Sequence, residues 1–216
     1  PTFTEAFARS CNTAFVIASE GLRDGALADV TERFGFGESL KIPLSVTPST
    51  FPQDMDAAQL AMSAIGQFEV QVTPLQMAMV AAAIANDGTM MQPYLVDSVV
   101  DADNRRHSKT SPRELRQAVA PEIAEQVKAM MVEAVSGSGA SGSAAQVPGI
   151  QVAAKTGTAE VGDGSRTNAW TVGFAPADDP QIAVAVIVEG SDTNPNPLGG
   201  SVAAPILSQL LEVGLK

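Results

Sequence analysis

The spacing of apolar residues changes at one point in the chain, the Gly/Ser run 136–143. Before the run, apolar residues recur every three or four positions, a pattern that predicts helices. These predicted helices begin after Thr4 and after Asn12, span 26–34, 56–65 and 74–86, and begin again at Pro121. After the run, the pattern predicts strands at 150–154, 170–174 and 182–188 and a closing helix at 202–213. Helices followed by strands with short connections indicate an α+β fold with a largely antiparallel sheet.

Several local expectations follow from the same patterns. Thr4 and Asn12 are residue types that cap the first turn of a helix, and a Gly/Ser run is typical of a flexible loop. The polar, turn-rich segment 101–111 holds His107, the only histidine, which we expect in solvent and not as the base of a Ser-His-Asp triad. The closing helix should pack on the sheet through Ile206, Leu207, Leu210 and Leu211.

Composition excludes several classes of protein. With 13 basic and 24 acidic residues the net charge is −11, which makes a basic face for nucleic acid hard to assemble. The chain is 45% apolar and 17% charged, as expected for a globular protein, and its 216 residues are compatible with one domain. The apolar stretches 77–85 and 182–188 are far shorter than the roughly 20 residues of a membrane-spanning helix. The single cysteine excludes an internal disulfide and a cysteine-cluster metal site.

The segment Lys155-Thr156-Gly157-Thr158 follows an apolar strand and has two interpretations. A phosphate-binding loop would need a glycine immediately before the lysine, where this chain has Ala154, and the acidic composition also argues against a nucleotide. The alternative is an edge strand beside an active-site groove, as in serine acyltransferases that process penicillin-like compounds.

The residue types of this segment fit the second interpretation. Gly157 lets an extended peptide approach and pair with the strand backbone. Lys155 supplies a positive charge, Thr156 and Thr158 supply hydroxyls suited to a carboxylate, and the Thr158 amide could face a developing oxyanion. Ser10-Cys11-Asn12 is by itself a weak signal, since a helix cap is the better interpretation of this segment taken singly.

Together, in this order, the two segments resemble the second and third signatures of the penicillin-binding protein and serine β-lactamase superfamily. Further stretches narrow the resemblance to class B, monofunctional penicillin-binding proteins, most similar to the penicillin-binding protein A type of actinobacteria, over nearly the whole chain. Phe68 departs from the glycine that many class B members have after Gly66-Gln67. The stretches that carry the resemblance are Ser10-Cys11-Asn12-Thr13-Ala14-Phe15, Ile65-Gly66-Gln67, Val72-Thr73-Pro74-Leu75, Ala85-Asn86-Asp87-Gly88, Pro93-Tyr94, Lys155-Thr156-Gly157-Thr158-Ala159-Glu160, Ala169-Trp170 and Phe174-Ala175-Pro176.

The resemblance implies a penicillin-binding protein transpeptidase or serine β-lactamase-like fold: an antiparallel sheet flanked by helices, with an all-helical subdomain. It implies a D,D-transpeptidase that cross-links peptidoglycan stem peptides through a serine acyl-enzyme and is inhibited covalently by β-lactams, with no cofactor and no metal. By position, Ser10 would relay a proton to the leaving D-alanine, Lys155 would hold that hydroxyl and the substrate carboxylate, and Asn12 would bind the substrate amide and the general-base lysine.

By the same resemblance, Thr156 and Thr158 would bind the terminal carboxylate, and Gly157 would leave room for the substrate backbone. Glu160 and Trp170 are expected in the groove wall or in strand packing. Cys11, between the two signature residues, is expected to be a packed, inert thiol. A β-lactamase ranks lower, because no deacylating base is identifiable.

The first signature of the family, Ser-x-x-Lys, is missing: no serine of the chain is followed by lysine three positions on. We therefore expect residues 1–216 to be the C-terminal part of a transpeptidase domain, inactive alone, with the nucleophile on an upstream segment together with two strands and a helix of the sheet. The alternative is a non-catalytic module of the same fold that senses β-lactams or serves as a division scaffold. The family also implies the extracytoplasmic face of the cytoplasmic membrane, an N-terminal anchor helix outside this chain, and division proteins as partners.

Overall fold

The computed structural model describes residues 1–40 and 42–216 and confirms the α+β prediction. Its helices are α1 Phe3–Ala8, α2 Asn12–Glu20, α3 Ala26–Arg33, α4 Ala57–Ser63, α5 Pro74–Ala85, α6 Pro121–Ser136 and α7 Ala204–Gly214. Its strands are β1 Thr89–Met91, β2 Ser98–Val100, β3 Arg106–Lys109, β4 Glu114–Gln117, β5 Ala153–Val161, β6 Arg166–Ala175 and β7 Ile182–Glu189. Among the described residues, no helix combines the length and the apolar character needed to span a membrane.

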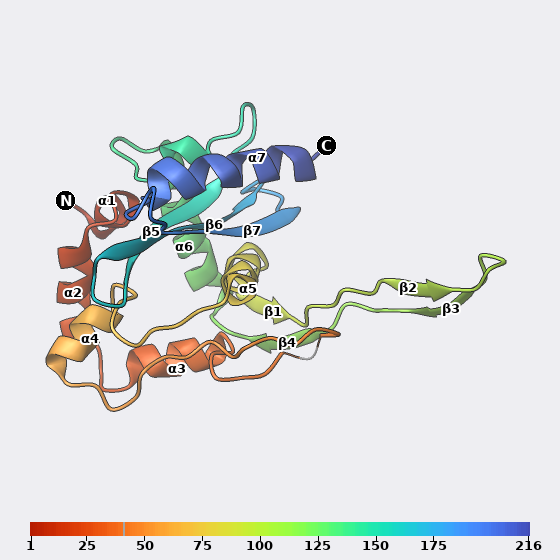
Figure 1. Ribbon diagram of the computed structural model, residues 1–216, viewed down its shortest axis with the longest axis horizontal. Helices are drawn as coiled ribbons and strands as arrows, with labels where there is room; N and C mark the ends of the chain where they lie inside the picture. The colour runs from red at the N-terminus through yellow and green to blue at the C-terminus, as the bar shows by residue number, and fades with distance from the viewer. Residues whose placement is uncertain (41) are drawn as a thin grey trace.

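The sheet that organises the molecule is antiparallel, with the order β5-β6-β7. Helix α7 covers one face, whereas α5 and α6 pack against the other (Figure 1). Successive side chains along a strand point to opposite faces of the sheet, so each strand contributes to two separate cores. Ala153 and its cross-strand partner Phe174 belong to the core with α5 and α6, whereas Ala154 and Val186 belong to the core with Leu207 of α7. Strand β7 is apolar from Ile182 to Val188, which fits a strand packed against α5 on one face and α7 on the other.

The helix starts differ from the sequence prediction by a few residues. Helix α1 begins at Phe3, because Thr2 caps it in a reciprocal pair of hydrogen bonds with Glu5, so the cap predicted at Thr4 is wrong. Helix α2 begins at Asn12 itself, and Cys11 occupies the cap position without a side-chain hydrogen bond. The interpretation of Asn12 as a cap is therefore wrong too.

Two further predictions were only partly right. Strand β5 begins at Ala153 and not at Ile150, because residues 147–150 form a tight turn in which Gly149 has a φ of 76°. Helix α7 buries Leu207 and Leu211, four positions apart, but Ile206 and Leu210 are 38% and 46% exposed. A single helix face packs on the sheet, so adjacent apolar residues cannot all reach it.

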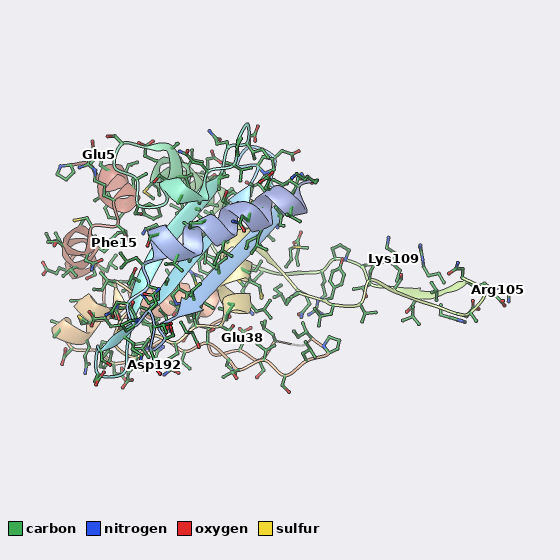
Figure 2. All side chains as sticks on the ribbon, turned by 45° about the horizontal axis from the view of Figure 1, so that its top comes forward. Glu5, Phe15, Glu38, Arg105, Lys109 and Asp192 are labelled. Atoms are coloured by element: carbon green, nitrogen blue, oxygen red, sulfur yellow. The ribbon has the colours of Figure 1, made fainter. Side chains whose placement is uncertain are left out.

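The polar segment 101–111 contains the predicted turn, at residues 101–105, and continues as β3, which forms half of a two-stranded ribbon. Strands β2 and β3 pair antiparallel, and the ribbon, residues 98–109, projects away from the rest of the molecule (Figure 1). Figure 2 shows Arg105 and Lys109 along this ribbon, which we call the arm. His107 lies on β3 and is exposed, as predicted, with Nε2 3.4 Å from an Asp101 carboxylate oxygen.

Candidate active site

The turn between α1 and α2 places Ser10 beside the sheet. Ser10 adopts a left-handed backbone conformation with a φ of 56°, which non-glycine residues rarely adopt because it costs about 1 kcal/mol or more. The turn is held by hydrogen bonds from the amide of Ser10 to the Phe7 carbonyl (3.0 Å) and from the amide of Cys11 to the Ala6 carbonyl (2.9 Å). Phe15 of α2 packs against Phe7 of α1, with their ring centres 6.1 Å apart, and so links the two helices. The Ser10 hydroxyl is therefore held in one place.

Lys155 of β5 contacts this hydroxyl directly. Its Nζ donates to Ser10 Oγ at 2.7 Å and to the Thr156 carbonyl at 2.8 Å, and it lies 5.6 Å from the centre of the Phe7 ring. Burial lowers the pKa of Lys155 to about 8, because the charged ammonium loses part of its hydration. At neutral pH Lys155 is mainly cationic, but it is far closer to releasing its proton than an exposed lysine. The Lys155 ammonium can therefore both orient the Ser10 hydroxyl and attract an anionic ligand.

Thr156 and Thr158 lie on the opposite face of β5 from Lys155, at the strand's free edge. Thr156 is buried, and its hydroxyl donates to Ser141 Oγ at 2.8 Å. Thr158 is exposed, and its hydroxyl accepts from the amide of Gly199 at 3.2 Å. Because β5 pairs only with β6 among the described residues, its other edge is open to an extended ligand.

Gly157 lies between these two threonines. A Cβ atom at this position would meet the Cβ of Trp170, its cross-strand partner on β6, at 3.4 Å. Without a side chain, Gly157 leaves this face of β5 uncovered beside Trp170.

The structure does not bring every predicted residue into contact. Ser10, Lys155 and Thr156 form one connected group, whereas Asn12 is exposed on the first turn of α2 and its side chain makes no hydrogen bond within the described residues. Its role toward a substrate amide and a general-base lysine remains a prediction. The prediction that Cys11 is packed is wrong, because its cap position at the start of α2 leaves it exposed.

A cavity of about 670 Å³ runs beside β5 and joins the predicted residues to an apolar wall. Lys155, Thr156, Gly157 and Thr158 line one part of it, and both Glu160 and Trp170 line it as expected for a groove wall. The apolar wall consists of Phe36, Phe51, Ile65, Phe68, Val72, Met77 and Ile187. An extended peptide with a carboxylate at one end and small apolar groups beyond it matches this lining.

The loop that follows α4 closes one side of the cavity. Gly66 and Phe68 have φ values of 75° and 63°, so Phe68 adopts the conformation that favours the glycine found at this position in many class B proteins. Between them, Gln67 donates through Nε2 to the Thr158 carbonyl at 3.4 Å, on the open edge of β5. The departure at Phe68 thus keeps a glycine-like backbone and adds an aromatic ring, 47% exposed, to the cavity.

Sequence reasoning missed some residues that shape the site. Ser141 was hidden in the Gly/Ser run, whose composition predicts only flexibility, and Phe7 was an ordinary apolar position of a short helix. Gly199 follows Pro197-Leu198 with no motif around it. No local signal identifies these residues, because each acts through a contact between segments distant in sequence. Within the described part of the chain, no group of three or more His, Cys, Asp or Glu side chains could hold a metal ion.

Comparison with known proteins decides the family. The sequence-family model described as "Penicillin binding protein transpeptidase domain" matches residues 1–212. The chain belongs to this family. Among solved structures, the ceftriaxone acyl-enzyme complex of penicillin-binding protein A from Mycobacterium tuberculosis superimposes with a TM-score of 0.91 at 39% identity, covering 100% of this chain and 48% of that one. The expected penicillin-binding protein fold and the similarity to the A type are confirmed.

Two curated relatives match nearly all of the chain. The peptidoglycan D,D-transpeptidase PbpA of Mycolicibacterium smegmatis is 46% identical over 206 residues, which cover 94% of this chain and 41% of the relative. Stage V sporulation protein D of Bacillus subtilis is 34% identical over 232 residues, covering 100% of this chain and 35% of the relative. The chain thus spans less than half the length of these two relatives.

Proposed function

We propose that the protein containing these residues is a peptidoglycan D,D-transpeptidase that cross-links stem peptides through a serine acyl-enzyme and is inhibited covalently by β-lactams. The observation that carries the proposal is the contact of Lys155 Nζ with Ser10 Oγ at 2.7 Å, beside the open edge of β5. The relatives support it, since similar proteins are named D,D-transpeptidases and have been solved as acyl-enzymes with penicillin G, imipenem and ceftriaxone.

The geometry suggests a division of roles. The C-terminal carboxylate of a stem peptide would lie against the hydroxyls of Thr156 and Thr158, with Lys155 as the nearby positive charge. Because Lys155 donates to Ser10 Oγ, the Ser10 proton is free to point at the substrate. Asn12, at the entrance to α2, would hold the substrate amide.

The reaction then proceeds in two steps. A serine hydroxyl attacks the carbonyl of the penultimate D-alanine and gives its proton to the lysine base, and the peptide C–N bond breaks while Ser10 relays that proton to the leaving nitrogen. An amine of a second stem peptide next attacks the acyl-enzyme, and the proton it loses returns through the same groups to the released serine. Since no Ser-x-x-Lys occurs in the chain, we place the nucleophile and its lysine base on residues outside these 216.

Domain organisation and location follow from the same proposal. Residues 1–216 would be the C-terminal part of one transpeptidase domain, and an upstream part would supply the remaining strands and the nucleophile. The substrate would place the protein at the extracytoplasmic face of the cytoplasmic membrane, anchored by an N-terminal helix outside these residues. Proteins of the division machinery would be its partners.

The proposal is tested on the full-length protein. Incubation with a fluorescent penicillin should give a covalent adduct that mass spectrometry maps to the serine of a Ser-x-x-Lys outside residues 1–216, and a purified stem pentapeptide should lose D-alanine and form a cross-linked dimer. Replacing that serine by alanine should abolish both. A folded protein that forms neither adduct nor dimer would refute the proposed activity.

A further inference from the structure

Ser141 connects the two segments that hold the predicted site residues. Its amide donates to the carbonyl of Ala8, at the end of α1 just before Ser10, at 2.9 Å. Its hydroxyl lies 2.8 Å from the hydroxyl of Thr156 on β5. The residue therefore bridges the helical turn and the edge strand, although composition places it in a run of glycines and serines.

The loop around Ser141 is held on several sides. The amide of the next residue, Gly142, donates to the Ala134 carbonyl of α6 at 2.9 Å, and a Cβ at Gly142 would meet the same carbonyl oxygen at 2.9 Å. A Cβ at Gly200 would overlap the Ser141 carbonyl oxygen. With a neighbouring backbone on each side, the Ser141 hydroxyl is fixed opposite Thr156, and the expected flexible loop is here a packed one.

The direction of the hydrogen bond between the two hydroxyls matters for ligand binding. A threonine hydroxyl has one proton and two lone pairs. Thr156 lines the cavity, and in the ligand-free arrangement it donates that proton to Ser141, so its hydroxyl has only lone pairs left for a ligand. A carboxylate is an acceptor and would be repelled by lone pairs, so it requires the Thr156 proton.

Both hydroxyls can rotate, and reversing their hydrogen bond solves this conflict. Ser141 then donates its proton to the Thr156 hydroxyl, and Thr156 donates its own proton to the carboxylate. The two hydrogen bonds form a chain in which each strengthens the other. We propose that Ser141 is a positioning residue for carboxylate recognition: it takes the Thr156 proton when the cavity is empty and donates its own when the ligand binds. The inference rests on the proposed function and assigns to Ser141 a role in choosing ligands that carry a carboxylate.

The test uses the full-length protein and a matched pair of ligands, benzylpenicillin and its methyl ester, whose reactive rings are identical. Ser141→Ala should lower the second-order acylation rate constant for the acid by about tenfold, since it removes one hydrogen bond to a charged-ligand network. The rate for the ester should change less than twofold, and Ser141→Thr, which keeps the hydroxyl, should restore the acid rate. Ser143→Ala, an exposed serine of the same run, is the control and should leave both rates unchanged.

A double mutant identifies the route of the effect. On a Thr156→Val background, Ser141→Ala should cause no further loss for the acid, because the hydroxyl through which it acts is already gone. Equal losses for acid and ester, or a full additional loss on the Thr156→Val background, would show a merely structural role and overturn the inference while leaving the transpeptidase proposal intact. Failure of the unmodified protein to react with either compound would refute the proposed function itself, and the inference with it.

Discussion

Lys155 Nζ lies 2.7 Å from Ser10 Oγ although the two residues are 145 positions apart. The contact joins the turn between α1 and α2 to β5, the edge strand of the three-stranded sheet. It also explains why a lysine can be accommodated there: the ammonium has lost much of its water but keeps two hydrogen bonds and an aromatic face. Site geometry thus depends on how the helical and sheet parts pack together.

Removing the charge of Lys155 should slow acylation strongly. Lys155→Met in the full-length protein keeps a side chain of similar length but loses the donor to Ser10, and Ser10→Ala loses the acceptor. We expect either change to lower the second-order rate constant with a fluorescent penicillin by about 10²- to 10⁴-fold. Lys109→Met on the arm is the matched control and should leave the rate unchanged. A near-normal rate in Lys155→Met, with the fold intact by circular dichroism, would remove this residue from the mechanism.

The acylation rate should depend on pH through the same lysine. The pKa of Lys155 is lowered to about 8, so the cation that attracts a carboxylate predominates below that pH and is lost above it. We expect the acylation rate constant for benzylpenicillin to fall as the pH rises through about 8. The methyl ester serves as the control, because its rate should lack this decrease. A rate for the acid that stays level up to about pH 10 would contradict the assignment.

Stability should respond to pH in the opposite direction. The unfolded chain titrates Lys155 at its ordinary pKa of 10.5, so between pH 8 and 10.5 the unfolded state binds more protons than the folded state. The free energy of unfolding therefore rises with pH across this window, whereas below it the cost of the buried charge is fully present. Urea unfolding at several pH values should show this rise in the unmodified protein. The Lys155→Met variant lacks this titration, so its free energy of unfolding should rise less between pH 8 and 10.5 than that of the unmodified protein. An equal rise in both proteins would contradict the prediction.

Much of the fold is predictable because it depends on local periodicity. The apolar run of β7 and the alternation of Trp170 and Phe174 on β6 indicate strands without any knowledge of their neighbours. Thr73 and Pro74 likewise mark the start of α5, where Thr73 accepts a hydrogen bond from the Gln76 amide. These signals are intrinsic to short segments, and the structure confirms them.

The remaining features depend on contacts between segments distant in the sequence, which no local sequence pattern predicts. Ser141 belongs to the site through the Ala8 carbonyl and the Thr156 hydroxyl, which come from segments far apart in the sequence. The start of β5 was misplaced because the turn at Gly149 takes up residues whose apolar character is strand-like. Asn12 and Lys155 were recognised by resemblance, and only Lys155 has its contact within the described residues.

Phe68 should carry a measurable backbone strain. Its φ of 63° is costly for any residue with a Cβ, by about 1 kcal/mol. Phe68→Gly and Phe68→Ala both remove the aromatic ring, but only glycine also relieves the strain. We expect the glycine variant to have the higher free energy of unfolding of the two by about 1 kcal/mol, measured by urea denaturation. An alanine variant as stable as the glycine variant would show that the backbone is not strained here.

Gly199 should tolerate no side chain. Its amide contacts Thr158 Oγ1 at 3.2 Å, and a Cβ there would overlap the Gly157 carbonyl oxygen and crowd that of Trp170. Gly199→Ala is expected to lower the free energy of unfolding by about 1–3 kcal/mol because the turn must move away from β5. Gly21→Ala is the control, since its nearest neighbour, the Ala18 carbonyl oxygen, lies at 3.8 Å. Equal stability of the two variants would refute the close approach.

The 216-residue chain by itself should not be labelled by a fluorescent penicillin. It contains Ser10 and the exposed thiol of Cys11 but no Ser-x-x-Lys, so the serine that the proposed mechanism acylates is not among these residues. The full-length protein, treated in parallel, should be labelled. A covalent adduct on the short chain, located by mass spectrometry at Ser10 or Cys11, would contradict this expectation.

The arm of β2 and β3 stands outside both cores, and its strands are almost entirely exposed. Substitutions within it therefore have little effect on the packing that holds Ser10 against Lys155. Among natural variants of this chain, sequence should drift fastest along the arm and slowest at Ala8, Ser141 and Gly199, where one altered atom would reach the site. The sequence of the arm can therefore change during evolution without altering the groove beside β5.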